Sequence, residues 1–279
     1  MKSADEIAAL FVKACRAELD ALKPGNVHRF EAGHGMTVED FETSADVSAP
    51  FLCAPGAGVG ARVLGAVSAT REAVGQNTNL GILLLCAPLA TAAELPRDPL
   101  RTSLDSVLAG LCPQDADDVF RAIALAAPGG LGMSPEADVR QQPHIGLRAA
   151  MRLAADRDLI ARQYANGFAE IFDIGVPLAV GRRMETAAQD VFLAFATALP
   201  DSHVARKFGD AAATGLMHRF RALAGAPQEA LASFDRVLKA EGLNPGTSAD
   251  MTVASLFAAA LGEKASKPSG TCLRGHGKD

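Results

Sequence analysis

Aromatic residues are scarce in this sequence. Among its 279 residues there is no tryptophan and one tyrosine, Tyr164, and aromatic residues make up 5% of the chain. Hydrophobic residues nevertheless account for 49%, so the core must be built mainly from alanine, aliphatic side chains and phenylalanine. Small alanine side chains favour helices and let them approach closely. A chain of this length can bury a substantial core, as one large domain or two small ones.

The motifs of several common protein classes are missing as well. There is no Walker A motif, no His-Glu-x-x-His motif and no Cys-x-x-Cys pair, so neither a P-loop ATPase nor a zinc site is supported. The formal net charge is −5 and no basic run is longer than Gly-Arg-Arg, so we expect no nucleic-acid partner. The cysteines are scattered, as is typical of a reducing compartment; they are Cys15, Cys53, Cys86, Cys112 and Cys272.

The sequence also lacks a hydrophobic run of membrane-spanning length. Its most apolar stretch, LGILLLCAPLA at residues 80–90, is too short to cross a bilayer and contains Pro88. The first residues, MKSADEIAAL, do not have the basic and apolar regions of a signal peptide. We therefore expect a cytoplasmic protein without membrane contact.

Helix signals dominate what is present. Ser3 and Glu6 form a capping-box pattern ahead of apolar residues at helical spacing, and Thr37 with Asp40 forms a second one. Sustained alternation of apolar and polar residues, which would indicate strands, is nearly absent. The pattern predicts an all-α fold with a single multi-helix domain over residues 1–264. The small, polar residues 265–279 are predicted to form a disordered tail.

Further helical stretches are expected along most of the chain. Their approximate ranges are 57–75, 80–92, 103–111, 115–127, 145–172, 184–199, 202–223, 227–241 and 248–262. The glycine-rich segment GAGVG at residues 56–60 resembles a dinucleotide-binding loop, but it follows Pro55 instead of a strand. Close packing between helices is the better explanation for these glycines.

Polar residues gather in five loops and expected helix starts. The groups are Lys23, Asn26, His28 and His34; Asn77, Thr78 and Asn79; Arg157, Asp158 and Arg162; Asp201, His203, Arg206 and Lys207; and Asn244, Ser248 and Asp250. Each group alone has a plain structural explanation, as helix caps, surface ion pairs or a solvated face. Together they would suit a nucleoside triphosphate, because helix N-termini, Arg and Lys bind phosphates and Asp can hold the accompanying Mg²⁺.

The motifs around these residues resemble those of the triphosphoribosyl-dephospho-CoA synthase family. KPGNVH, NTNLGILLLCAPLA, DRDLIARQYANGF, LPDSHVARKFG and LNPGTSADMTVASLF occur in the order and approximate spacing of that family, from about residue 5 to residue 262. The resemblance implies an all-α enzyme that uses ATP. In the family, the 5-triphosphoribosyl group of ATP moves to a hydroxyl of 3′-dephospho-CoA and adenine leaves, which is a glycosyl transfer.

The resemblance also implies roles for individual residues. Lys23, Arg206 and Lys207 would hold phosphates, and Asn77 and Asn79 would bind ribose or phosphate. Asp201 or Asp250 would bind Mg²⁺ or act as a base, and His28 or His34 would serve proton transfers. Asp40 is a further candidate metal ligand. The remaining candidate contacts to the nucleotide are Asn26, Thr78, Arg157, Asp158, Arg162, His203 and Ser248.

Some positions depart from the family pattern. Where the family has Gly-Leu-Val-Asp after Lys-Pro, this chain has Gly25, Asn26, Val27 and His28. The aspartate of a His-x-Asp-Met segment and an Arg-Gly-Glu-Ala segment are absent too. In these respects the chain resembles a divergent branch found in archaea and in bacteria with methanopterin-type one-carbon cofactors. The change from Asp to His at position 28 is a place where the identity of the acceptor could have shifted.

Three hypotheses follow. The first is triphosphoribosyl transfer from ATP to dephospho-CoA. The second is the same transfer to another acceptor in one-carbon cofactor biosynthesis, which the departures favour. The third is a non-catalytic helical nucleotide-binding protein. Release of free adenine separates the first two from the third, and dependence on the acceptor separates the first from the second. Expected partners are small molecules, and Ala- and Leu-rich helix faces would suit a homodimer.

Overall fold

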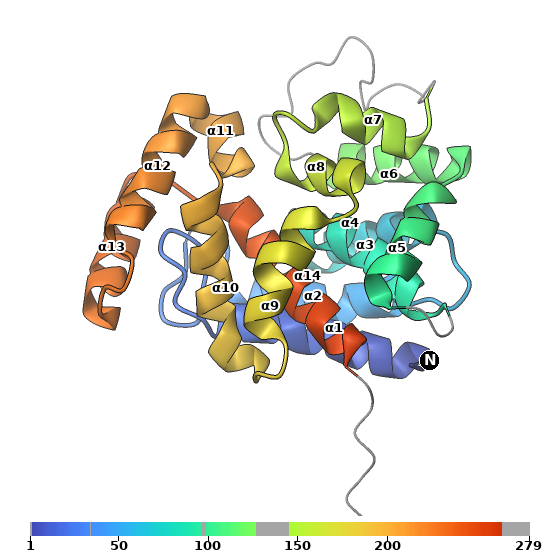
Figure 1. Ribbon diagram of the computed structural model, residues 1–279, viewed down its shortest axis with the longest axis horizontal. Coiled ribbons are helices and arrows are strands. Elements are labelled where there is room, and N and C mark those ends of the chain that lie inside the picture. The colour runs from blue at the N-terminus through green and yellow to red at the C-terminus, as the bar shows by residue number, and fades with distance from the viewer. Residues whose placement is uncertain (1, 34, 96–98, 127–144, 264–279) are drawn as a thin grey trace, which may run out of the picture.

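The computed structural model describes residues 2–33, 35–95, 99–126 and 145–263. In these residues the chain forms fourteen α-helices and one π-helical segment, η1, and no sheet (Figure 1). The prediction of an all-α, single multi-helix domain is confirmed. The expected tail at 265–279 and His34 lie outside the described residues. The elements are α1 (Ala4–Leu19), α2 (Val38–Leu52), α3 (Val59–Val74), α4 (Leu80–Ala93), α5 (Leu100–Ala109), α6 (Pro113–Ala126), α7 (Leu147–Ala154), α8 (Leu159–Asn166), η1 (Ile171–Gly175), α9 (Val176–Ala179), α10 (Met184–Ala198), α11 (Ser202–Phe208), α12 (Asp210–Ala222), α13 (Gln228–Ala240) and α14 (Gly246–Gly262).

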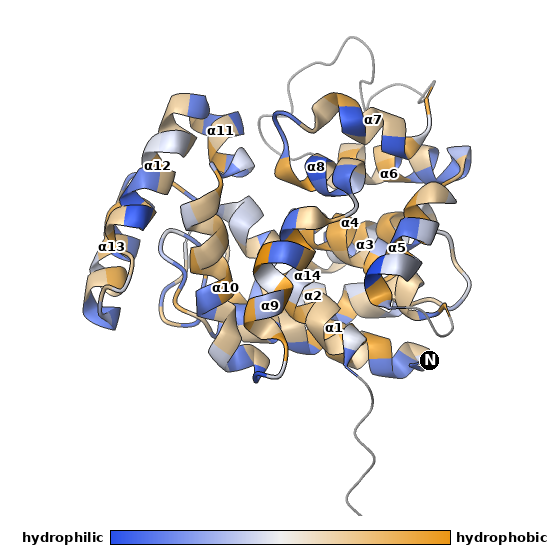
Figure 2. Cartoon of the chain, in the orientation of Figure 1, coloured by the Kyte–Doolittle hydropathy of each residue, from blue (hydrophilic) through white to orange (hydrophobic). Residues whose placement is uncertain are grey.

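Two helices form the centre of the molecule. Eleven of the fourteen residues of α4 are buried, as are thirteen of the seventeen residues of α14. A helix that is apolar on all sides is expected to be surrounded by other helices, and α4 is coloured as hydrophobic along most of its length in Figure 2. The apolar run at 80–90 is thus explained as a core helix. No helix in the described part of the chain is both long and apolar enough to cross a membrane.

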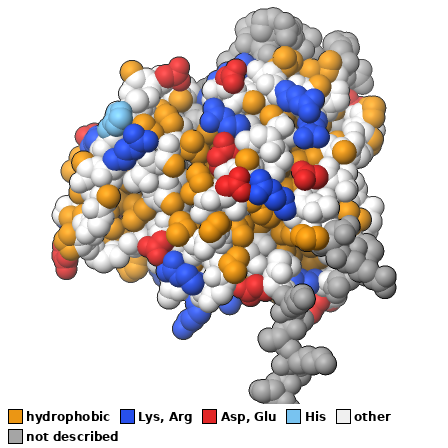
Figure 3. Space-filling model, in the orientation of Figure 1, with side chains coloured by type: hydrophobic (Ala, Val, Ile, Leu, Met, Phe, Trp, Pro, Cys, Tyr) orange, Lys and Arg blue, Asp and Glu red, His pale blue; other side chains and the backbone are white. Residues whose placement is uncertain are grey.

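The remaining helices form two groups on either side of this centre (Figure 1). α6, α7 and α8 lie at one end, and α11, α12 and α13 lie beyond α10. The second group shares a small core with α10 and α14, in which the rings of Phe192 in α10 and Phe220 in α12 meet edge to face with their centroids 5.9 Å apart. Basic and acidic side chains are interspersed on the face that Figure 3 shows. Residues from the first turns of α4, α8 and α14 line the cavity that is described below.

Both predicted capping boxes are confirmed. The Ser3 hydroxyl accepts a hydrogen bond from the Glu6 amide, while the Glu6 carboxylate accepts one from the Ser3 amide at 2.6 Å. Thr37 and Asp40 make the same reciprocal pair at the start of α2, with the Thr37 amide 2.8 Å from Asp40 Oδ2. These side chains satisfy amide groups that the first helical turn leaves without partners.

Two stretches that were predicted as continuous helices are interrupted. The stretch 145–172 divides into α7, α8 and η1, because Asp158 caps a new helix and Gly167 ends it with φ of +74°. The stretch 202–223 divides at Gly209, whose φ is +88°. Glycine adopts such left-handed conformations without steric cost, so hydrophobic periodicity can continue across the break.

The glycine-rich segment 56–60 provides close packing, as expected. A Cβ atom on Gly60 would lie 2.6 Å from the Cα of Asp115 in α6, and the Gly60 amide donates to Asp115 Oδ1 at 2.8 Å. Helices α3 and α6 can therefore approach this closely only because position 60 carries no side chain. Gly56 instead occupies a turn with φ of +71°.

Candidate functional site

A cavity of about 860 Å³ lies where the two groups of helices meet the centre. Its volume falls within the range of small-molecule sites in proteins, roughly 300–1,000 Å³. Residues from α1, α2, α3, α4, α6, α7, α8, α11, α12, α14 and the loops that precede several of them line it. The lining is divided into a polar end and an apolar end.

Three helix N-termini contribute to the polar end. The first turns of α4, α8 and α14 reach it through Gly81, Ile160 and Ala249, respectively. First-turn amides have no acceptor within their own helix, and the helix dipole adds partial positive charge there. Such an arrangement attracts an anion with several oxygens.

Basic side chains stand beside these helix starts. Arg157, Arg206 and Lys207 line the cavity. Arg206 Nη1 lies 2.7 Å from Asp158 Oδ2, while the other carboxylate oxygen of Asp158 caps α8 by accepting from the amides of Ile160 and Ala161. Asp158 therefore fixes both the helix start and the direction of the Arg206 guanidinium.

Asp201 joins two of the helices behind the cavity wall. It is 3% exposed, and its carboxylate accepts four hydrogen bonds, from the amides of His203 and Val204 and from the amide and hydroxyl of Ser248, at 2.8–3.2 Å. Burial raises the pKa of Asp201, while the bonds from Ser248 and Val204 oppose that change. These contacts tie the start of α11 to the start of α14.

Asp250 is the carboxylate that faces into the polar end from α14. It is partly exposed and lines the cavity, and no described residue donates a hydrogen bond to it. Its Oδ2 lies 2.0 Å from the position that a Cβ on Gly81 would take. Burial, followed by the negative charges of Asp201 and Glu18, raises the pKa of Asp250 well above its usual range, and Arg206 opposes this.

A buried polar network reaches the cavity from α1. Glu18 pairs with Lys23, whose Nζ also donates to Asn26 Oδ1 at 2.8 Å, and Asn26 Nδ2 donates to Asn244 Oδ1 at 2.7 Å. Glu18, Asn26 and Asn244 line the cavity, whereas Lys23 is 0% exposed behind them. Burial raises the pKa of Glu18 and lowers that of Lys23, and each charge opposes the shift of the other.

The apolar end is formed mainly by α6 and α7. Phe120 and Ile123 of α6 line it together with Ala150 and Met151 of α7. Leu84 of α4 lines the cavity as well. Such a surface suits a flat or extended ligand part that carries little charge.

The cavity collects just over half of the residues that the sequence singled out. Those that line it are Asn26, Asn77, Thr78, Arg157, Asp158, His203, Arg206, Lys207, Asn244 and Asp250. Lys23, Asn79, Asp201 and Ser248 are buried and do not line it. Asn79 Nδ2, for example, donates to Thr70 Oγ1 at 3.1 Å. These side chains support the wall.

Three other candidates lie elsewhere. His28 is 1% exposed, with Nε2 3.1 Å from Asp235 Oδ2. Asp40 caps α2 and accepts from Gln76 Nε2 at 3.3 Å. Arg162 Nε donates to the carbonyl of Ala155 at 3.1 Å. None of the three lines the cavity, so direct contact with a nucleotide remains a prediction for them.

Sequence reasoning missed Glu18, Arg71 and Gln76, which also line the cavity. A signal for Glu18 existed. It continues the buried face that Ile7, Phe11 and Ala14 define at helical spacing. A carboxylate on the apolar face of a helix needs a partner or a function.

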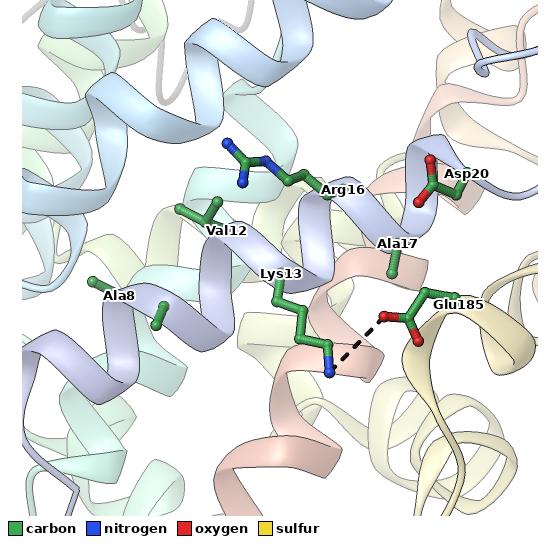
Figure 4. Close-up of a pocket in the computed structure, with 8 residues that line it drawn as sticks. Ala8, Val12, Lys13, Arg16, Ala17, Asp20 and Glu185 are labelled. Atoms are coloured by element: carbon green, nitrogen blue, oxygen red, sulfur yellow. Dashed lines mark ion pairs between the residues drawn. The ribbon is translucent and has the colours of Figure 1, made fainter.

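A second hollow of about 530 Å³ runs along the outer side of α1. Figure 4 shows Ala8, Val12 and Ala17 on this helix between charged side chains, with Lys13 and Glu185 joined by an ion pair of 3.9 Å. The Lys13 side chain is exposed, and that of Glu185 is partly buried. One helix start, that of α10 through Glu185, contributes to the lining of this hollow, whereas three meet in the larger cavity, so the larger cavity is the candidate functional site.

No three or more His, Cys, Asp or Glu side chains in the described parts of the chain form a group that could hold a metal ion. The carboxylates of Asp158 and Asp250 nevertheless both line the cavity beside Arg206. Oxygen ligands of this kind are those that Mg²⁺ prefers, commonly one or two from the protein together with substrate phosphates. The residues present fit a cation that arrives with a polyphosphate.

Comparisons with known proteins identify the family. A crystal structure from Archaeoglobus fulgidus, described as a triphosphoribosyl-dephospho-CoA synthase, superimposes with a TM-score of 0.66 over 77% of this chain and 96% of the other, at 24% identity. At that identity the likeness establishes the fold. No curated protein matches the chain significantly. Residues 4–269 match the family described as ATP:dephospho-CoA triphosphoribosyl transferase. Since this match covers nearly the whole sequence, the chain belongs to the ATP:dephospho-CoA triphosphoribosyl transferase family.

Proposed function

We propose that the cavity is the site at which this transferase moves the 5-triphosphoribosyl group of ATP to a hydroxyl of 3′-dephospho-CoA and releases adenine. One observation carries this location. Three helix N-termini and four basic side chains meet in a cavity that also has an apolar end. The family match favours neither a different acceptor nor a non-catalytic binding protein.

The chemistry sets the requirements for the site. The bond between C1′ of the ribose and N9 of adenine breaks, and its electron pair leaves with the base. A hydroxyl oxygen of the acceptor then forms the new bond to C1′, which carries positive charge in the transition state. The protein must hold the triphosphate, align the hydroxyl with C1′ and keep water away.

The triphosphate would occupy the polar end. Arg206 and Lys207 of α11, together with Arg157, supply positive charge there, and the first turns of α4, α8 and α14 add the positive ends of their helix dipoles. Arg206 is the best oriented of the three cations, because Asp158 holds its guanidinium at 2.7 Å. Bidentate contact between a guanidinium and phosphate oxygens adds geometric specificity.

Mg²⁺ would enter with ATP as part of the substrate. A triphosphate placed beside Asp250 and Asp158 would be repelled unless a cation lay between them. Asp250 suits this role because no described residue donates a hydrogen bond to its carboxylate. Asp201, with four accepted hydrogen bonds, serves to position the wall instead.

The adenine base of ATP would lie against the apolar end. Phe120, Ile123 and Met151 offer a surface on which an uncharged purine can be buried. The ribose would then span the distance between the two ends, which places C1′ over the middle of the cavity. The homodimer and the cytoplasmic location expected from the sequence stay predictions.

The reaction is tested by incubating purified protein with MgATP, with and without 3′-dephospho-CoA, and separating the products by chromatography. Adenine formed only in the presence of 3′-dephospho-CoA supports the proposal. Adenine formed without it would indicate hydrolysis, and no adenine under either condition would refute the reaction for this chain.

The location is tested by Arg206→Met. Loss of a charge-assisted hydrogen bond costs about 1.5–3 kcal/mol, so kcat/KM for ATP should fall about 10- to 100-fold. Arg219→Met is the matched control, since Arg219 also holds a carboxylate, Glu241 Oε2 at 2.6 Å, but does not line the cavity. Equal kinetics for the two variants would refute the placement of the triphosphate.

A further inference from the structure

We propose that Glu18 is the general base that accepts the proton of the attacking hydroxyl, and that the buried Lys23 is the positioning residue that holds Glu18 in place. The inference rests on the proposed function of the cavity. It assigns a catalytic role to a residue outside the polar motifs of the sequence.

The geometry of Glu18 supports this role. It belongs to the last turn of α1, its side chain is 5% exposed, and it lines the cavity. One carboxylate oxygen, Oε1, is paired with Lys23. No described residue donates to the other oxygen, Oε2, which leaves an acceptor for a substrate hydroxyl.

Lys23 holds this carboxylate in a fixed network. Its side chain is 0% exposed, and its Nζ donates hydrogen bonds to Glu18 Oε1 and Asn26 Oδ1. Asn26 is anchored in turn to Asn244 at 2.7 Å. A base whose cation is itself anchored by a second partner does not have to be ordered when the substrate binds, which lowers the entropic cost of reaching the transition state.

Burial of this ion pair is difficult to explain by stability alone. Removing two charges from water costs several kcal/mol for each ion, and apolar residues of similar volume often serve as well or better. Ionisable groups whose pKa values are shifted and which line a cavity are candidates for function. Here three members of a four-residue network line the same cavity.

The charges around Glu18 suit proton acceptance. Lys23 favours the ionised carboxylate and opposes the effect of burial on its pKa. Asp250 is the second carboxylate near this end of the cavity, and Lys239 acts on Lys23 from α13. A base with a pKa that burial raises above that of a free carboxylate accepts a proton more readily at neutral pH.

The step balances as follows. The hydroxyl oxygen forms its bond to C1′ and gives its proton to Glu18. The bond between C1′ and N9 breaks, adenine leaves with that electron pair, and a proton from solvent neutralises it. Glu18 then returns its proton to solvent, so that ATP and the acceptor give the triphosphoribosyl product and free adenine.

The first test compares Glu18→Gln with Glu94→Gln. Glu94 also pairs with a fully buried cation, Arg62, at 2.7 and 2.8 Å, but it does not line the cavity. General-base catalysis contributes about 10²- to 10⁴-fold, so we expect kcat to fall by that factor in Glu18→Gln with little change in KM for ATP. Glu94→Gln should keep the kcat of the folded wild type. If the wild type releases adenine and Glu18→Gln has the same kcat, the role of Glu18 as general base is refuted, while the proposed function of the cavity stands.

The second test is a pH profile, which does not depend on a stable Glu18 variant. Wild-type kcat/KM should rise with pH along a limb that reports ionisation of a carboxylate. In Lys23→Met the limb should move to higher pH, because the carboxylate loses its cation, and activity should recover partly in alkaline buffer. Glu18→Asp should retain intermediate activity. A wild-type profile without an acidic limb, or a limb that Lys23→Met leaves in place, would contradict the assignment.

Discussion

Gly81 offers the sharpest test of how the cavity is built. It is the second residue of α4, and a Cβ added to it would lie 2.0 Å from Asp250 Oδ2, 2.5 Å from Asp250 Cγ and 2.8 Å from Ile160 Cδ1. Real Cβ atoms essentially never approach other heavy atoms below 3.0 Å. Gly81→Ala must therefore push the carboxylate of Asp250 away by more than an ångström.

The effects on stability and on activity should separate. Gly81 does not have a left-handed φ, so alanine fits the backbone and helix propensity favours it by up to about 1 kcal/mol. This gain offsets part of the clash, and we expect the free energy of unfolding to change by less than about 2 kcal/mol. Misplacing a reacting or metal-binding group by about 1 Å can cost roughly 100-fold in rate. We therefore expect kcat/KM for MgATP to fall by about that factor.

The assay is adenine release under saturating 3′-dephospho-CoA, together with thermal unfolding of the same preparations. Gly215→Ala is the matched control, because Gly215 lies inside α12 and a Cβ there would meet no heavy atom within 4 Å. That variant should be as stable as the wild type or more so, and fully active. Wild-type kcat/KM in Gly81→Ala would refute the argument that the space beside Gly81 is reserved for the carboxylate of Asp250.

Two further predictions concern parts of the fold away from the chemistry. Phe11→Ala should lower the free energy of unfolding by about 3–5 kcal/mol, because Phe11 is 0% exposed and its ring meets Phe257 edge to face at 5.9 Å. Calorimetry should show this loss of stability, while activity per folded molecule at 25 °C stays unchanged. Asp235→Asn should cost about 3 kcal/mol at neutral pH, because it leaves His28 and Lys239 without their carboxylate. Burial tends to raise the pKa of Asp235, but the bonds from His28 and Lys239 prevail and lower it below 3.8. The difference in unfolding free energy between Asp235→Asn and the wild type should therefore be complete above that pH and shrink as the pH falls through the lowered pKa. Urea unfolding at several pH values measures this difference. A difference that does not change with pH would contradict the reasoning.

Local sequence signals predicted much of this fold because they act within a few residues. The Ser3–Glu6 and Thr37–Asp40 pairs are complete within a single turn, and each is present in the structure. Gly209 shows the limit of such signals. Apolar residues continue at helical spacing on both sides of it, and only its φ of +88° reveals that α11 and α12 are separate helices.

The site was less accessible to sequence reasoning because its parts come from distant segments. Asn26 and Asn244 are separated by more than two hundred residues, yet their side chains are 2.7 Å apart. Motifs identified the polar residues that line the cavity from α8, α11 and α14. They did not identify Arg71 or Gln76 near the end of α3, where nothing in the local pattern distinguishes a cavity residue from a solvated one.

The structure also gives a different interpretation of His28, a position at which the chain departs from the family pattern. The replacement of Asp by His suggested a change of acceptor, but His28 is 1% exposed and does not line the cavity. It holds Asp235 of α13, whose other oxygen accepts from the amide of Gly25 at 2.8 Å. A histidine here thus brings α13 against the turn that carries Asn26, and Asn26 does line the cavity. The departure therefore lies behind the cavity wall, in the support of the turn that carries Asn26.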